Sequence, residues 1–63
     1  MEYTKKIVYQ SNYWYNDGLR KAKIRDMSGA IMSLRKSLQF NRENIAARNL
    51  LGLVYYGIGE VPE

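Results

Sequence analysis

The stretch NIAARNLLGLVYYGIG, residues 44–59, decides the fold because it is apolar around nearly the whole helix that its spacing predicts. Its side chains form one broad face on a helical wheel, Ile45, Leu51, Val54, Tyr55 and Ile58, and a group that extends that face, Ala46, Ala47, Leu50 and Leu53. A helix of this kind needs packing neighbours on two sides. We expect the rest of the chain to supply only one of them.

Two helices are predicted before this stretch. The first runs from about residue 4 to 25, because larger apolar residues recur at helical spacing and no Gly or Pro interrupts before Gly18. An alternative makes residues 1–10 a separate short arm, with Ser11 or Asn12 capping a helix that starts there. Gly18 costs about 1 kcal/mol relative to Ala in a helix interior, and close approach of a neighbouring helix is the usual compensation.

The second predicted helix spans residues 27–41, with Asp26 as its N-cap. Its apolar stripe is Met27, Ala30, Ile31, Leu34 and Leu38, and its opposite, solvent-facing side is Ser28, Ser33, Arg35, Lys36 and Gln39. Short connectors between successive helices force antiparallel neighbours. The sequence therefore predicts a single all-α domain over residues 1–63, with three helices running up, down and up.

The last four residues, Glu60 to Glu63, have the composition of a helix start, with an acidic first turn and a proline where it is tolerated. We therefore expect the chain to end inside a repeat, with one flank of the third helix uncovered. In the opposite case the first ten residues cover that flank and close the bundle.

Composition argues against several functional classes. The chain has no Cys and no His, and its six acidic residues are scattered without a convergent pair. We accordingly predict no catalytic residues, no metal site and no cofactor. No apolar run approaches the roughly 20 residues needed to cross a bilayer, so we expect no membrane insertion. The absence of Cys fits a reducing compartment, and we expect a cytoplasmic location.

The net charge of +4 admits one other partner class, nucleic acid. Basic residues are dense at Arg20, Lys21, Lys23 and Arg25, which suits either the solvated side of a helix or a phosphate-binding stripe. Asp17 and Lys21 have the i, i+4 spacing of an intrahelical ion pair. We expect the solvated side and keep a basic module that contacts nucleic acid as the alternative function.

A partial repeat is visible at an offset of 34 residues, the separation of Gly18 and Gly52. In this respect the chain resembles the tetratricopeptide repeat family, a 34-residue helix-turn-helix unit. Residues 11–44 match its pattern at Trp14, Gly18, Asp26, Ala30, Ile31, Leu34, Leu38 and Asn44. They depart from it at Asp17, Lys21, Arg25, Ser37 and Arg42. Residues 45–63 match as a truncated second unit at Leu51, Gly52, Tyr55, Gly59 and Glu60, with Arg48 at the usual Trp position.

The resemblance implies a non-catalytic protein-interaction scaffold in which each unit hides its apolar face by stacking on the next. It implies repeat-packing roles for Trp14, Gly18, Ala30, Leu34, Leu51, Gly52 and Tyr55. It also implies a groove for a peptide or partner helix, lined by Asn12, Tyr15, Leu19, Lys23, Asn49, Leu53 and Tyr56. The third helix is then expected to cover its free flank by homo-oligomerisation, by an exchanged helix or by contact with another protein.

Overall fold

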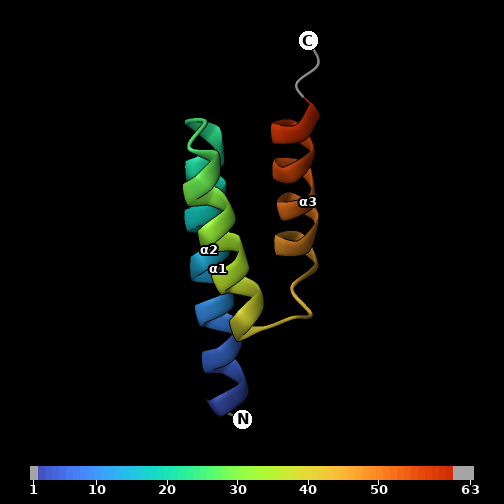
Figure 1. Cartoon of the computed structure of the whole chain (residues 1–63). Helices are drawn as coiled ribbons and strands as arrows, with labels where there is room; N and C mark the ends of the chain where they lie inside the picture. Colours follow the sequence, from blue (N-terminus) through green and yellow to red (C-terminus); the bar gives the residue numbers. More distant parts are fainter. Residues whose placement is uncertain (1, 61–63) are drawn as a thin grey trace.

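The computed structural model describes residues 2–60, with side chains described over residues 5–57, and this part of the chain forms three helices. They are α1 (Glu2–Lys23), α2 (Met27–Phe40) and α3 (Ile45–Glu60). Figure 1 shows α1 rising, α2 descending beside it and α3 rising again, which confirms the predicted all-α class and the up-down-up order. Glu60, expected to open a further helix, is the last residue of α3. Residues 61–63 lie outside the described part.

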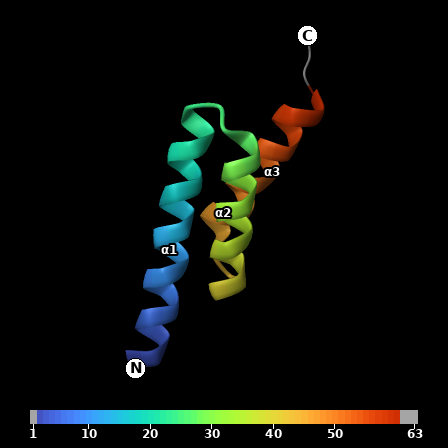
Figure 2. The ribbon, with the colours of Figure 1, turned by 60° about the vertical axis from the view of Figure 1, so that its left-hand side comes forward.

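The first helix is continuous from Glu2 to Lys23, so the alternative of a separate N-terminal arm is wrong. Its N-terminal end extends past the end of α2, as both views of the ribbon show (Figures 1 and 2). Helix α3 packs mainly against α2 and has little contact with α1. The first residues of the chain therefore do not close the bundle over α3.

The turn between α1 and α2 depends on backbone geometry at Arg25. This residue has φ 67°, in the left-handed region where glycine is usual. The Arg25 amide donates to the Ala22 carbonyl at 3.0 Å and the Asp26 amide donates to the Lys21 carbonyl at 2.8 Å, so the last carbonyls of α1 are satisfied. Asp26 then caps α2, because its Oδ1 accepts from the Gly29 amide at 3.0 Å, as the sequence predicts.

The apolar core is small and lies between α2 and its two neighbours. Its buried apolar side chains are Ala30, Leu34, Ala47 and Val54. Partly buried side chains pack around them: Tyr15, Ala22, Met27, Ile31, Leu38, Leu50 and Leu51. Both the α1 to α2 contact and the α2 to α3 contact therefore depend on the stripe of α2 that the sequence predicts.

A buried polar cluster joins all three helices at one end of the bundle. The Ser11 hydroxyl donates to the Ser37 carbonyl at 2.9 Å, and the Ser37 hydroxyl donates to the Ser11 carbonyl at 2.7 Å. Asn44 Nδ2 donates to Ser11 Oγ at 2.8 Å, while its Oδ1 accepts from the Ala47 amide at 3.1 Å. One asparagine thus caps α3 and fixes where α3 begins relative to α1 and α2.

Candidate functional site

Helix α3 has two sides that differ sharply in burial. Ala47 and Val54 belong to the core, and Leu50 and Leu51 pack against it. On the other side, large apolar residues are exposed to solvent, with Ile45 at 66%, Leu53 at 65%, Tyr55 at 47% and Tyr56 at 71%. The helical wheel places Ile45 and Tyr55 on one broad apolar face with Leu51 and Val54, and the structure leaves the first two on the uncovered side of α3. Ile58 belongs to the same predicted face, and its side chain lies outside the described residues.

The exposed side of α3 has a regular spacing that the sequence-based assignment missed. Ile45, Asn49, Gly52 and Tyr56 follow an i, i+4, i+7, i+11 series, which is the heptad spacing of a helix-helix contact line. We call these four residues the outer seam. It is flanked on one side by Ala46 and Leu53 and on the other by Arg48 and Tyr55, and all eight residues are exposed.

Gly52, near the middle of the outer seam, contrasts with Gly18 in α1. A Cβ added at Gly18 would lie 2.7 Å from Leu34 Cγ and 3.3 Å from the Ala30 carbonyl oxygen, so α2 approaches α1 closely there. A Cβ added at Gly52 would meet nothing within 4 Å. Both glycines carry the cost of a flexible residue inside a helix. Of the two, Gly18 alone has a compensating contact among the described residues.

The predicted groove residues fall into two groups. Asn49, Leu53 and Tyr56 lie on or beside the outer seam of α3. On α1, Asn12 and Lys23 are exposed, whereas Tyr15 and Leu19 are half-buried. Asn12 Oδ1 accepts from Asn44 Nδ2 at 3.3 Å, and Tyr15 packs against the core, so both contribute to holding the helices together.

Among the predicted repeat-packing residues, Gly18, Ala30 and Leu34 meet at the α1 to α2 contact. Leu51 packs against the core from α3, whereas Gly52 and Tyr55 are exposed. The ring of Trp14 lies edge-on to Tyr13, with centroids 5.2 Å apart, and 4.9 Å below the Lys36 ammonium. Trp14 is half-buried, and its aromatic and cationic partners come from α1 and α2.

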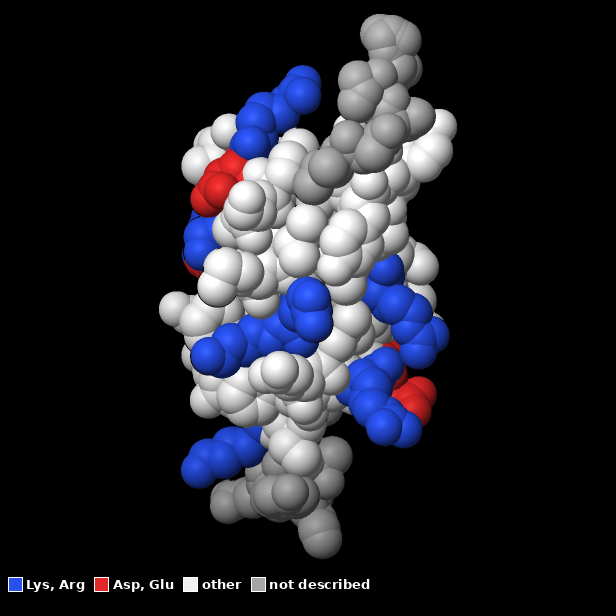
Figure 3. All heavy atoms as spheres, in the orientation of Figure 1, with Lys and Arg blue, Asp and Glu red and all other residues white. Residues whose placement is uncertain are grey.

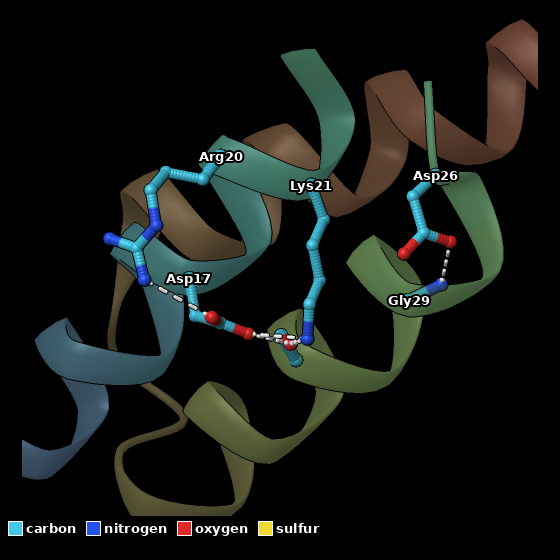
Figure 4. Close-up of polar contacts among 6 residues, drawn as sticks. Asp17, Arg20, Lys21, Asp26 and Gly29 are labelled. Atoms are coloured by element: carbon cyan, nitrogen blue, oxygen red, sulfur yellow. Dashed lines mark hydrogen bonds and ion pairs between the residues drawn. The ribbon is translucent and has the colours of Figure 1, made fainter. Parts of the chain in front are cut away.

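Asp17 forms ion pairs with basic side chains near the C-terminal end of α1 (Figure 4). Its Oδ2 lies 2.8 Å from Lys21 Nζ, which confirms the predicted ion pair, and its Oδ1 accepts from Arg20 at 3.2 Å. The Ser33 hydroxyl of α2 also donates to Oδ2, at 2.6 Å. Ser33 is buried, so its assignment to the solvent side of α2 was wrong: it is held inside by this bond. The bonds from Lys21 and Ser33 hold the pKa of Asp17 below its ordinary value, against the opposing effect of burial.

The basic residues do not form one continuous stripe. Arg20 and Lys21 are engaged with Asp17, and Lys36 lies over Trp14. Figure 3 shows Lys and Arg side chains spread along the molecule with uncharged surface between them. The described residues of α3 include a single charged side chain within 45–57, that of Arg48. The outer seam therefore contains no charged residue, and its flanks contribute Arg48 alone.

Comparison with family models, curated proteins and solved structures finds no match for this chain. In the described residues no helix has the length and apolar content to pass through a lipid bilayer. The same residues contain no group of three or more carboxylate, imidazole or thiol side chains placed to hold a metal ion.

Proposed function

We propose that this chain is a non-catalytic protein-interaction module that takes a helix of a partner protein against the outer seam of α3. The observation that carries the proposal is the exposure of Ile45, Leu53 and Tyr56 around an open Gly52. A helix can lie in such a surface with its apolar residues between the exposed side chains and its backbone close to the glycine.

The chain itself illustrates the contact that we propose. At Gly18, the α2 helix places Leu34 over the glycine, and Leu34 is completely buried there. Gly52 lies 34 residues further on, at the separation of the tetratricopeptide-like pattern, and lacks such a neighbour in the described structure. We infer that an antiparallel partner helix would place a side chain over Gly52 in the same way. Asn49, which is exposed on the outer seam, offers an amide group for contact with a peptide backbone.

The non-catalytic part of the proposal is supported by composition and by the state of the charged groups. Without His or Cys, general acid-base or nucleophilic chemistry at neutral pH would have to use carboxylates, lysines or hydroxyls. Asp17, the acidic side chain that is drawn toward the interior, is bound to Lys21, Arg20 and Ser33. These bonds stabilise its charged form and tie it to the α1 to α2 contact.

A panel of amphipathic helical peptides tests the proposal. Peptides are selected from a displayed library against the wild-type chain, and their affinities are then measured for Leu53→Lys and for the control Met32→Lys. Met32 is 72% exposed but lies on α2. We expect Leu53→Lys to weaken binding about tenfold or more, because a lysine ammonium would be desolvated in the contact, and Met32→Lys to leave it within about twofold. Equal affinities for the three proteins would contradict the assignment of the outer seam.

A further inference from the structure

We propose that the partner helix is α3 of a second copy of this chain, so that two copies associate through their outer seams with the helices antiparallel. This inference rests on the proposed function and names the partner. It follows from the order of side-chain sizes along the seam. Ile45 and Tyr56 lie at its two ends, and the small Gly52 lies beside Asn49 at its middle.

An antiparallel pair matches each position of the seam with a complementary one. The two-fold axis passes midway between Asn49 and Gly52, so Ile45 of one copy meets Tyr56 of the other, and Asn49 meets Gly52. Every layer then combines a larger side chain with a smaller one. A parallel pair in register would instead place Gly52 against Gly52 and Tyr56 against Tyr56, which leaves a void next to an overfilled layer.

The flanking residues fit the same arrangement. Leu53 of one copy lies opposite Ala46 of the other, so the apolar side chain on that flank covers a small residue. On the other flank Arg48 lies opposite Tyr55, and a guanidinium packs favourably on an aromatic ring. Arg48 is the one charged side chain of α3 within residues 45–57. Each copy therefore brings one positive charge and no carboxylate to the contact, although the whole chain has a net charge of +4.

The size of the seam indicates a weak dimer. Residues 45–56 span about three helical turns. The large apolar side chains of the seam and its flanks, Ile45, Leu53, Tyr55 and Tyr56, are between 47% and 71% exposed. Pairing two such surfaces buries on the order of 1,000 Å², near the lower limit for a specific protein contact. We therefore expect a dissociation constant in the micromolar range or above.

Sedimentation velocity over a concentration series tests whether the chain pairs with itself. The wild type should move from monomer toward dimer as its concentration rises, and Leu53→Lys should weaken the dimer about tenfold or more. Met32→Lys, the control, should stay within about twofold of wild type. Circular dichroism establishes that each variant is folded, and Tyr56→Lys serves as a second variant if Leu53→Lys is not. A Leu53→Lys dimer as tight as that of wild type overturns the proposal.

Cysteine cross-linking tests the antiparallel register, and the chain has no native Cys to interfere. A mixture of Ala46→Cys and Leu53→Cys should form the mixed disulfide under mild oxidation. Ala46→Cys alone should not, because its two copies are about 13 Å apart along the antiparallel axis. A disulfide between two copies of Ala46→Cys would overturn the antiparallel arrangement. A chain that stays monomeric yet binds helical peptides through Leu53 would overturn self-association and leave the proposed function standing, whereas loss of both would overturn both.

Discussion

The same substitution should have opposite effects at the two helix-interior glycines. Replacing Gly with Ala gains about 1 kcal/mol of helix propensity wherever the new methyl group has space. Gly52→Ala meets nothing within 4 Å and should therefore stabilise the monomer by about that amount. The gain appears only where α3 stays helical and unpaired, so the measurement needs a dilute sample.

At Gly18 the new methyl group would lie 2.7 Å from Leu34 Cγ and 2.8 Å from Leu34 Cδ2. Leu34 is completely buried, and its Cγ is the branch point of the side chain, so it cannot rotate away cheaply. Overpacking of this kind costs about 1–3 kcal/mol, which exceeds the propensity gain. We expect Gly18→Ala to destabilise the chain by about 1 kcal/mol, and so to differ from Gly52→Ala by about 2 kcal/mol.

Urea and thermal unfolding followed by far-ultraviolet circular dichroism measure this difference. For a chain of this size 1 kcal/mol corresponds to about 4–8 °C in Tm, so the two variants should be separated by about 10 °C. In a Leu34→Ala background, Gly18→Ala should lose most of its penalty, because the clashing atoms are gone. If Gly18→Ala stabilised the wild-type background as much as Gly52→Ala does, the close approach of α1 and α2 would be refuted.

Three further predictions concern the caps and charges. Asn44→Ala should cost about 2 kcal/mol of unfolding free energy, because it removes the α3 cap together with the bond to Ser11; a cost below about 0.5 kcal/mol in urea unfolding would contradict the three-helix role of that side chain. Arg25→Gly should stabilise by up to about 1 kcal/mol, since Arg25 has φ 67°, and a lower Tm would argue against that turn. The bonds that lower the pKa of Asp17 stabilise the fold at pH values above the pKa of the unfolded chain, which is about 4. This contribution is lost as the pH falls through the pKa of Asp17 in the folded chain. The unfolding free energy of Asp17→Asn should therefore be lower than that of wild type at pH 7, and the two values should converge in acid. A difference that stays constant with pH would contradict the ion-pair assignment.

Sequence patterns were sufficient for the helices and for one side of the packing. The stripe of α2 could be predicted because Ala30, Ile31, Leu34 and Leu38 recur at helical spacing, whereas the charged Arg35 and Lys36 lie outside it. Asp26 was predictable as a cap because it precedes an apolar stripe. The cost of Gly18 in mid-helix also pointed to a close helix neighbour, and the structure places Leu34 there.

The orientation of α3 could not be predicted in the same way, because its apolar residues surround the helix. Hydropathy does not separate Leu50 and Leu51, which pack against the core, from Leu53, which is 65% exposed. The heptad spacing of the outer seam was a signal that could have identified it. Ser11, Ser33 and Ser37 were unpredictable for a different reason: a serine is buried only when a specific partner satisfies its hydroxyl, and here the partners lie 16 to 26 residues away in sequence.

The most direct measurement of the central claim is a concentration series of amide NMR spectra of the wild-type chain. If the outer seam is the contact, signals that shift with concentration should cluster at Ile45, Asn49, Gly52 and Tyr56 and their flanks, while core residues such as Leu34 stay fixed. Spectra that do not change with concentration, or shifts concentrated on α1 and α2, would contradict the claim that α3 uses this surface to pair.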